Sequence, residues 1–340
     1  MERHGRTYRE PVSTPTPTST SVRSQAGPAA SVDRRPGGGV RTWVQFLAAG
    51  LVWGASFLFI AVALTGLSFT QVAWARIVLG ALTLGVVVLV ARPHVAGGPV
   101  LPREPVVWLH FLVIGVAGCV VPFLLFSWAQ QTVTSSLASI LNATTPIMTA
   151  LIATLAFRVE RLDASRWLGV VVGIVGVVVI IGPWQAAFGG DLAGQLAILG
   201  ATACYGVMFG YTRRFLSGRP IAATTFAFLQ VGMAGAVMLL LTPLLALGPV
   251  RLDVAVVVCL AVLGIAGTGL AYVWNIAVIR DWGPTNASTV TYVTPVVGVV
   301  LGVLILSEPL TWNEPVGALV VMTGILLAQG RVRMPRRARA

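Results

Sequence analysis

One arginine, Arg76, stands inside an apolar stretch that runs from Phe69 to Ala91. A charge in such a stretch needs water, a partner or a backbone carbonyl, because burying it alone among apolar groups is costly. Its guanidinium could hold a carboxylate or a phosphate of a bound molecule. Alternatively, the side chain could reach the nearer end of the stretch and place its charge in water, or fix a helix end. The sequence leaves both interpretations open.

Small polar residues form a stripe in each of two other apolar stretches. The members are Ser135, Ser139, Asn142 and Thr145 in the first stretch and Ser288, Thr291 and Tyr292 in the second. Neighbours along each stripe lie mostly three or four residues apart, so each stripe occupies one face of a helix. Each is followed by a proline, Pro146 or Pro295, which frees a backbone carbonyl. The stripes could be the hydrogen-bonding wall of a cavity, or they could simply pack helices together.

Aromatic side chains at helical spacing could supply the apolar part of the same cavity. Trp53 with Phe57, and Tyr205 with Phe209, lie four residues apart. A mostly apolar pocket with a few hydroxyl and amide groups is typical of small-molecule sites, although core packing is the simpler role for any one ring. The predicted binding residues are Trp53, Phe57, Arg76, Phe123, Ser139, Asn142, Tyr205, Tyr272, Asn275, Ser288, Thr291 and Tyr292.

Patterns for catalysis or metal binding are missing from the sequence. The three cysteines are isolated in apolar stretches, and the three histidines form no ligand pair. No phosphate-binding glycine loop or nucleophile elbow occurs, and no acidic or histidine pair lies inside an apolar stretch. We therefore predict that the protein is not an enzyme and uses no metal and no cofactor.

The elements that carry these residues are long and apolar. Apolar residues make up 56% of the 340 residues and charged residues only 10%, against about 25% charged residues in soluble proteins. Stretches of about 20 apolar residues recur, each long enough to cross a bilayer as a helix. We predict an all-α, polytopic membrane protein with ten transmembrane helices. Their expected limits are 43–64, 69–91, 107–128, 134–157, 167–183, 195–213, 221–247, 254–279, 285–306 and 313–330.

Arginines indicate how these spans are oriented. The net charge is +12, and all 23 basic residues are arginine. With a cytoplasmic N-terminus, ten spans place 21 of them on the cytoplasmic side, leaving Arg251 outside and Arg76 within a span. Because basic residues are enriched in cytoplasmic loops, we predict a multi-pass protein of the inner cell membrane with both termini in the cytoplasm. Topology thus accounts for the basic charge, and nucleic acid is not expected as a partner.

The chain contains a similar segment twice, over residues 135–176 and 284–324. Ala138-Ser139 and Thr145-Pro146 match Ala287-Ser288 and Thr294-Pro295, and Glu160-Arg161-Leu162 matches Glu308-Pro309-Leu310. A glycine pair, Gly115 and Gly118 against Gly264 and Gly267, extends the match into earlier spans. Since each half holds an odd number of spans, five, the halves must have opposite orientations. We therefore predict two inverted five-helix repeats, an arrangement common in transporters.

Taken in order, these motifs resemble the drug/metabolite transporter superfamily, and within it proteins with two EamA domains. The resemblance is carried by Trp53-Gly54 with Phe57, by Arg76, by the helix with Pro146, and by the two glutamate turns that lead into glycine-containing helices. It covers residues 43–330 and implies a ten-helix alternating-access carrier, commonly an exporter of amino acids, metabolites or drugs. It implies no particular substrate. The second half has Phe228 where the first has Arg76, so any role of that arginine is not duplicated.

We accordingly expect a disordered cytoplasmic tail at 1–42, EamA-like repeats at 43–183 and 195–330, and a basic cytoplasmic tail at 331–340. The predicted function is export of a small metabolite, an amino acid or a drug-like compound across a lipid bilayer, by a monomer or a homodimer. Import or exchange of a nucleobase or a sugar-like metabolite is one alternative. A membrane receptor or scaffold that transports nothing is an alternative of another class.

Acidic residues bear on how such transport would be driven. All eleven lie in tails, loops or span ends, whereas ion-driven carriers often use a carboxylate near the bilayer centre. Our hypothesis is therefore facilitated diffusion, exchange, or coupling through a group at an edge. Glu160 and Glu308 are predicted to be structural, either capping the following helix or pairing with arginines such as Arg161 and Arg166.

Overall fold

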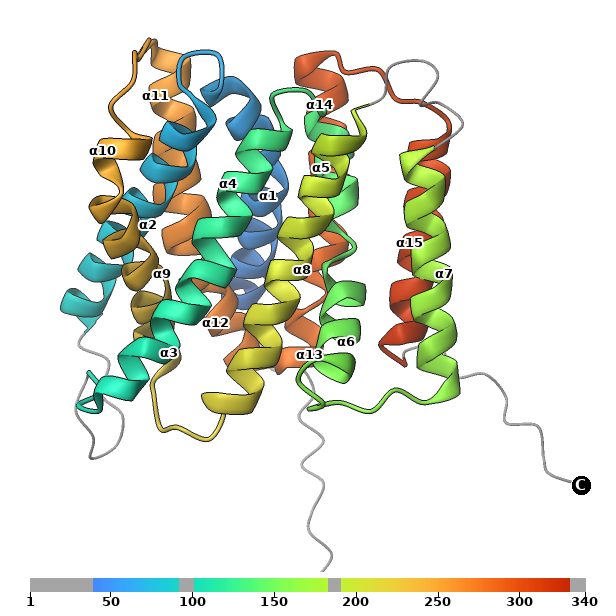
Figure 1. The fold of residues 1–340 in the computed structure, drawn as a ribbon, viewed down its shortest axis with the longest axis horizontal. Coiled ribbons are helices and arrows are strands. Elements are labelled where there is room, and N and C mark those ends of the chain that lie inside the picture. The colour runs from blue at the N-terminus through green and yellow to red at the C-terminus, as the bar shows by residue number, and fades with distance from the viewer. Residues whose placement is uncertain (1–38, 92–100, 183–190, 331–340) are drawn as a thin grey trace, which may run out of the picture. The chain divides into compact units, whose positions relative to one another are not determined.

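Helices make up every regular element of the computed structural model, which describes residues 39–91, 101–182 and 191–330 (Figure 1). Eight helical segments are long and apolar enough to cross a membrane, and two further apolar helices are 17 and 16 residues long. The elements are α1 (Val40–Ala63), α2 (Phe69–Ala91), α3 (Pro105–Gly115), η1 (Val116–Val120), α4 (Val121–Ala129), α5 (Ser135–Asn142), α6 (Thr145–Leu155), α7 (Ala164–Ile181), α8 (Leu192–Phe215), α9 (Ala223–Leu240), α10 (Thr242–Leu245), α11 (Val254–Ala261), η3 (Val262–Leu270), α12 (Ala271–Trp282), α13 (Pro284–Ala287), α14 (Val290–Leu306) and α15 (Asn313–Ala328). The predicted ten-span, all-α membrane fold is confirmed.

Several spans contain an interruption that the apolar pattern did not predict. The third and eighth spans each contain a π-helical segment, η1 and η3. The fourth span is broken between α5 and α6, just before Pro146, and the seventh is broken at Leu241, before Pro243. The ninth is broken between α13 and α14, whereas Pro295 lies inside α14. The first helix begins at Val40, and residues 1–38 of the predicted N-terminal tail, like 331–340, lie outside the described residues.

The spans alternate in direction along the chain. In Figure 1, α1 begins at the end drawn at the bottom, which we call the lower end, and α8 begins at the upper end. Each span of the second half therefore runs opposite to its counterpart in the first half. This is the arrangement that five spans per repeat require.

Packing between the halves follows the same inverted symmetry. The first span packs on the ninth, α1 on α14, just as the sixth packs on the fourth, α8 on α6. Likewise α4 packs on α8, and its counterpart α12 packs on α1. Corresponding helices meet across the symmetry axis in three pairs, which are α2 with α9, α5 with α14 and α7 with α15. The central helices of each half are therefore held by helices of the other half.

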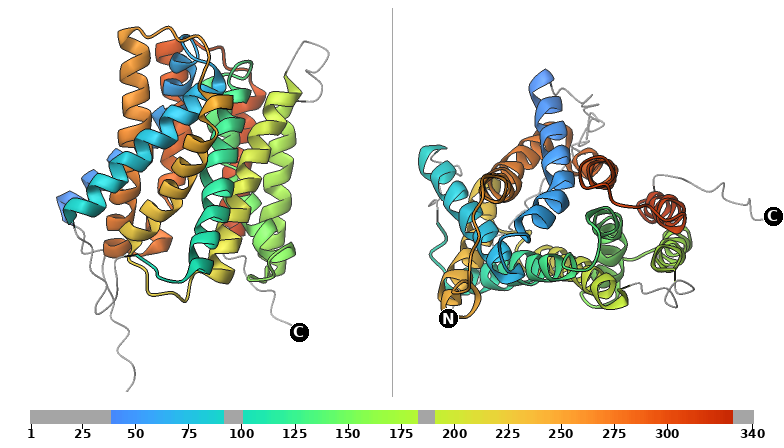
Figure 2. Two further views of the ribbon diagram at one scale, coloured as in Figure 1. Left: turned by 60° about the vertical axis from the view of Figure 1, so that its left-hand side comes forward. Right: turned by 90° about the horizontal axis from the view of Figure 1, so that it is seen from above.

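Glycines allow α7 and α15 to approach closely, and these two helices lie side by side in two views (Figures 1 and 2). A Cβ atom at Gly169 would collide with the backbone nitrogen of Ala328, and one at Gly324 would lie 2.5 Å from the backbone nitrogen of Gly173. Small residues at such contacts let helix backbones pack directly in membranes. The glycines of the repeated segment therefore serve helix packing.

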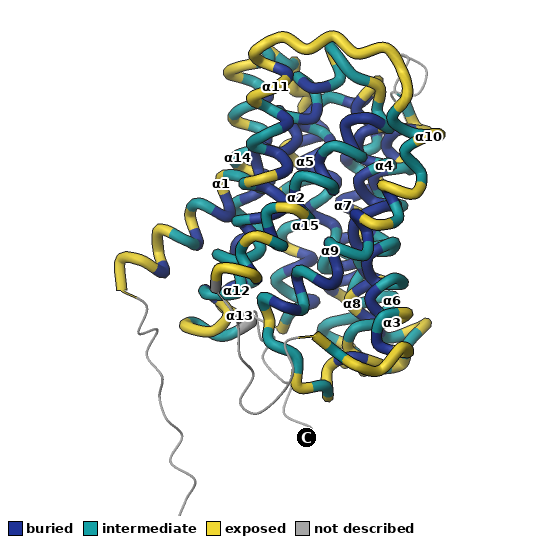
Figure 3. The backbone as a smooth tube through the Cα atoms, turned by 90° about the vertical axis from the view of Figure 1, so that its left-hand side faces the viewer, coloured by how far each residue is buried: buried dark blue, intermediate teal, exposed yellow. Residues whose placement is uncertain are grey.

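Apolar side chains face outward along the spans, as expected where lipid surrounds a protein. Leu82, Leu244, Leu304 and Leu319 are each more than half exposed. Buried, intermediate and exposed residues alternate along most helices (Figure 3). The protein is thus a multi-pass membrane protein whose spans carry many exposed apolar side chains on their outer faces.

Acidic and hydroxyl side chains begin several helices. Oδ1 of Asp253 accepts a hydrogen bond from the backbone N–H of Val256 (2.8 Å), at the start of α11. Asp191, just before α8, accepts a hydrogen bond from the hydroxyl of Thr132, and this bond holds the pKa of the Asp191 carboxyl below its ordinary value. Such carboxylates complement the positive end of a helix dipole. They are structural groups at the ends of spans.

Candidate functional site

A cavity of about 210 Å³ lies between helices of both halves. The first half contributes α1, α2, α4, α5 and α6, and the second contributes α8, η3, α12 and α14. Its lining consists of Trp53, Ser56, Phe57, Ile60, Arg76, Phe123, Phe126, Asn142, Ala143, Thr145, Pro146, Tyr205, Met208, Phe209, Gly267, Tyr272, Thr291 and Thr294. The cavity is therefore built by the two inverted repeats together.

Arg76 is turned into this cavity. Its side chain is 8% exposed, so it does not extend to water at the end of α2. Its Nε donates a hydrogen bond to Oγ1 of Thr268 (3.0 Å), and its guanidinium carbon lies 3.8 Å from the centre of the Phe123 ring. Among the described residues, no acidic side chain forms an ion pair with Arg76. The charge is therefore held by a hydroxyl and an aromatic face, without a neutralising partner.

Aromatic rings form most of the wall around Arg76. Trp53 packs edge-on against Tyr272 at 6.1 Å between ring centres, and its Nε1 donates to the carbonyl of Gly267 (3.0 Å). One turn along α1, Phe57 packs edge-on against Phe126 at 5.7 Å. Phe126 in turn lies 6.1 Å from Tyr205 of α8. These contacts join α1, α4, α8 and α12, so the rings bridge the two halves.

The polar stripes divide between the cavity and the helix contacts. Asn142 and Thr145 line the cavity, and the hydroxyl of Thr145 donates to the carbonyl of Asn142 (2.7 Å), which Pro146 would otherwise leave unpaired. On the facing helix, Thr291 lines the cavity. Ser139 is fully buried against Gly298 and donates to the carbonyl of Thr294 (3.4 Å). Each stripe therefore serves both of the roles that its sequence left open.

Eight of the twelve predicted binding residues line the cavity. They are Trp53, Phe57, Arg76, Phe123, Asn142, Tyr205, Tyr272 and Thr291. The other four, Ser139, Asn275, Ser288 and Tyr292, do not line it. The hydroxyl of Tyr292 instead donates to Oε1 of Gln329 (2.7 Å), beyond the end of α15. The cavity thus gathers predicted residues from both halves of the chain.

Some lining residues carry no chemical signal that would single them out in the sequence. Ser56 and Ile60 lie three and seven residues after Trp53, and Met208 lies three residues after Tyr205. They share a helix face with the aromatic residues, so helical spacing alone could have added them. Gly267 could not have been found in this way, because it lines the cavity through the backbone of a π-helix.

Comparison with known proteins identifies the family. The profile of the EamA-like transporter family matches residues 42–182 and again residues 192–329. The chain belongs to the EamA-like transporter family. The matches correspond to the two repeats of the fold, and together they cover most of the chain.

Similarity to individual proteins supports the assignment of this chain to the EamA-like transporter family. The chain is 24% identical over 279 residues to the uncharacterized transporter YdfC of Bacillus subtilis (strain 168), covering 81% of this chain and 86% of the relative. An uncharacterized transporter of Archaeoglobus fulgidus is 24% identical, and the match covers 85% of this chain and 98% of the relative. A protein of known crystal structure shares the fold, with a TM-score of 0.54 and 20% sequence identity. The match covers 86% of this chain and 99% of that protein's chain. The protein is thus a membrane transporter rather than an enzyme by family.

A carboxylate joins the two halves of the EamA-like transporter at the upper end. Glu308, which follows α14, accepts hydrogen bonds from the backbone N–H groups of Ser135 (2.7 Å) and Ser136 (2.9 Å). It also accepts bonds from the hydroxyls of Ser135 (3.1 Å) and Ser136 (2.6 Å). We call these four bonds the Glu308 clamp. The predicted structural role of Glu308 is confirmed, but its carboxylate caps α5 of the other repeat instead of the following helix.

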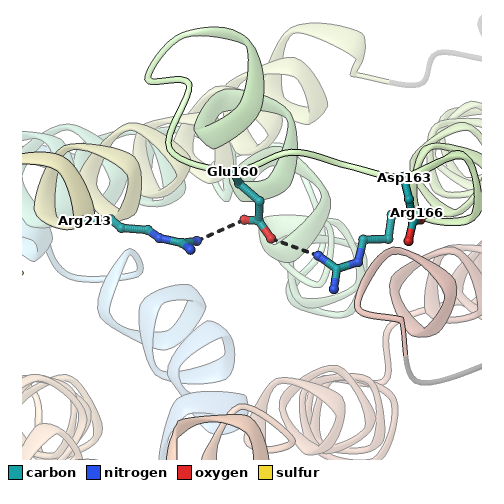
Figure 4. Close-up of polar contacts among 4 residues, drawn as sticks. All are labelled: Glu160, Asp163, Arg166 and Arg213. Carbon is teal, nitrogen blue, oxygen red and sulfur yellow. Dashed lines mark hydrogen bonds and ion pairs between the residues drawn. The ribbon is translucent and has the colours of Figure 1, made fainter. Parts of the chain in front are cut away.

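Glu160, the counterpart of Glu308, lies at the lower end and has different partners (Figure 4). Its carboxylate forms ion pairs with Arg166 and Arg213, each at 3.3 Å. The pairing with Arg166 confirms its predicted structural role, and the contact with Arg213 additionally ties the turn to α8. Asp163 in the same turn caps α7 by accepting a bond from the backbone N–H of Arg166 (2.9 Å). Among the described residues, Glu308 therefore caps a helix of the other half at the upper end, whereas Glu160 contacts the other half at the lower end through the exposed side chain of Arg213.

Proposed function

We propose that the protein moves a small organic molecule by alternating access, with the cavity as its binding site. The observation that carries this proposal is that both inverted repeats line one cavity. A site at the interface of such repeats becomes accessible from one side or the other when the repeats rock against each other. The eight predicted residues that line the cavity are our proposed binding set.

The Glu308 clamp gives the proposed motion a specific barrier. It holds the upper ends of α5 and α14 together, and these helices come from different repeats. For the cavity to open at that end, the four bonds must break. Glu160 then offers the equivalent carboxylate for holding the lower end in the opposite state. Hydrogen bonds to a charged group contribute about 1.5–3 kcal/mol, which is enough to bias an equilibrium between two such states.

The distribution of arginines supports an orientation. Nine of the eleven described arginines lie near the lower ends of spans, while Arg251 lies before α11 at the upper end and Arg76 lies in the cavity. By the enrichment of basic residues on the cytoplasmic side, we place the lower end and both termini in the cytoplasm of a cell whose inner membrane holds the protein. The Glu308 clamp then closes the outer end.

Size and lining constrain what is carried. A cavity of about 210 Å³ is smaller than the roughly 300–1,000 Å³ of most ligand pockets, which favours a small metabolite over a large drug. We propose export as the direction. Import or exchange of a nucleobase or a sugar-like compound, and a receptor or scaffold role, are the alternatives. The proposal holds equally for a monomer and for a homodimer, because residues of a single chain line the cavity.

A substrate screen tests the proposed function. The protein is expressed in cells that lack their own exporters, and resistance to toxic amino-acid, carboxylate and nucleobase analogues is scored. Thr291→Phe, which fills the cavity, should abolish any resistance, whereas Val300→Phe, on the lipid-facing side of the same helix, should keep it. Resistance that survives Thr291→Phe would count against transport through this cavity. So would a lack of resistance both in the unaltered protein and in Val300→Phe.

A further inference from the structure

We infer that the substrate is an organic monocarboxylate with a small apolar or aromatic body, and that it leaves the cell as an anion. This inference rests on the proposed function and assigns a substrate class to the same cavity. It depends on the charge of the cavity, on the orientation of Arg76 and on the shape of the lining, which are taken in turn below.

The charge of the cavity is set by one residue. Arg76 is the only charged side chain among the described residues that line it. The eight acidic residues within the described part of the chain all lie at helix ends or between helices, as Glu104, Glu160, Asp163, Asp191, Asp253, Asp281, Glu308 and Glu314 do. A buried positive charge without a partner is unfavourable. A substrate with one negative charge would neutralise it, whereas a cation would add to it.

The neighbours of Arg76 leave one part of its guanidinium available. Nε is occupied by Thr268, and Phe123 covers one face of the group. The two terminal amino groups of Arg76 donate no hydrogen bond to another side chain among the described residues. Arginine presents such groups as a planar fork that matches the two oxygens of a carboxylate. The side chain is therefore fixed at one end and presents donors at the other.

Carboxylate is favoured over phosphate by charge. A phosphate monoester carries about −1.5 to −2 at neutral pH, so one arginine would leave part of that charge without a partner in an apolar cavity. A monocarboxylate carries one charge and is matched by one guanidinium. The rings of Trp53, Phe57 and Tyr272 surround the remaining space, which suits an apolar or aromatic body. The side chains of Asn142 and Thr291 can accept or donate a single further hydrogen bond with a polar group of the substrate.

The same charge suggests what drives export. A membrane potential, negative inside, favours outward movement of an anion, and about 100 mV corresponds to roughly a 50-fold concentration ratio for one charge. Arg76 remains with the protein, so the substrate itself would carry the charge across. No carboxylate in the spans is required for such a mechanism. This fits the placement of the described acidic residues at helix ends.

A binding experiment on the full chain in lipid nanodiscs tests the substrate class. The probes are carboxylates from benzoate to 4-phenylbutyrate, the neutral isostere 3-phenylpropanamide, and phenyl phosphate, each scored by its effect on thermal unfolding. We expect at least one carboxylate to bind at least about tenfold more tightly than 3-phenylpropanamide and than phenyl phosphate. Arg76→Gln should abolish that preference, and Arg76→Lys should weaken it, because lysine keeps the charge but loses the fork. Arg103→Gln, an exposed arginine, should change nothing.

The outcomes separate this inference from the proposed function. Equal binding of amide and carboxylate, preference for phenyl phosphate, an unchanged preference in Arg76→Gln, or no binding by any carboxylate would each overturn it. In proteoliposomes, efflux of the bound carboxylate should accelerate several-fold when a potassium gradient with valinomycin makes the interior negative, and potential-independent efflux would contradict movement as an anion. If neutral compounds are transported through the cavity and carboxylates are not, the substrate class fails while the transporter proposal stands.

Discussion

Thr268 and Phe123 hold the guanidinium of Arg76 from two sides, and Thr268 has a second bond of its own. Its hydroxyl donates to the carbonyl of Leu263 (3.2 Å), five residues earlier in η3. A π-helix leaves its carbonyls spaced for such contacts. The hydroxyl oxygen can therefore accept from Arg76 while its proton is committed to the backbone, which fixes the orientation of the arginine.

Replacing this hydroxyl should weaken the site without removing its charge. In Thr268→Val the shape is kept and the bond to Nε of Arg76 is lost, so we expect carboxylate affinity to fall by about three- to tenfold, corresponding to one hydrogen bond of about 1 kcal/mol. The measurement is the nanodisc binding assay. Thr323→Val removes an exposed hydroxyl that donates to the carbonyl of Leu319 in its own helix, and it is the matched control. Equal affinity in both variants would mean that Thr268 does not position Arg76.

Sequence reasoning could single out Arg76 but could not determine where its side chain points. A lone arginine in an apolar stretch is compatible with an inward or an outward orientation. The inward orientation of the side chain is set by Thr268, which is 192 residues away in the chain, and by Phe123 in another span. The predicted residues that miss the cavity show the same limit. Ser139 and Asn142 lie on one helix face, but only Asn142 lies level with the cavity.

Among the elements, α5 and α14 form the contact that the proposed motion must change. In Glu308→Gln the carboxylate that accepts two N–H and two O–H bonds becomes an amide with donors of its own. We expect this change to shift the equilibrium toward an open outer end by about 10- to 100-fold, from a loss of about 1.5–3 kcal/mol. Spin labels at Gln131 and Leu310, which flank the clamp, should report longer distances by electron resonance.

Glu160→Gln is the control for this prediction, because it neutralises the equivalent carboxylate at the other end. Its two ion pairs are partly exposed, and such pairs contribute about 0–1 kcal/mol. The distance between the labels should therefore stay as in the unaltered protein. If both variants change the distance equally, or neither does, the clamp does not hold the outer end.

The α7–α15 pair should be sensitive to single methyl groups. A Cβ atom at Gly324 would lie 2.5–2.7 Å from backbone atoms of Gly173 and Gly169, which cannot turn aside as a side chain could. We expect Gly324→Ala to lower the free energy of unfolding by about 1–3 kcal/mol, measured as a lower midpoint of thermal unfolding. Gly200→Ala, in α8, meets only a Leu125 side-chain atom at 3.6 Å and should be neutral or slightly stabilising. Equal midpoints would contradict direct backbone packing.

Element boundaries were predictable from apolar length, whereas interruptions within spans were not. The break before Pro146 follows from the missing N–H of proline, yet Pro295 lies within an unbroken α14. Gly118 lies within η1 and Gly115 directly before it, while Gly264 and Gly267 lie within η3, so a sequence pattern marked the place of these π-helices but not their geometry.

At the scale of the whole molecule, inversion of the repeats followed from simple reasoning. Internal similarity plus five spans per half requires opposite orientations, and the directions of the helices agree (Figure 1). What the sequence could not supply was how the halves interlock, with α1 on α14 and α8 on α6. These contacts depend on side-chain shape over long sequence separations. They are also what brings residues of both repeats around the cavity.

The most direct test of alternating access asks from which side of the membrane the cavity can be reached. A single cysteine is placed at Asn142, which lines the cavity, or at Ser139, which is buried one turn away, after Cys119, Cys204 and Cys259 have been replaced. A membrane-impermeant thiol reagent is then applied to one face of sealed vesicles of known orientation. We predict that the cysteine at 142 reacts from each face and the one at 139 from neither. Reaction of the cysteine at 142 from one face only, or from none, would contradict alternating access.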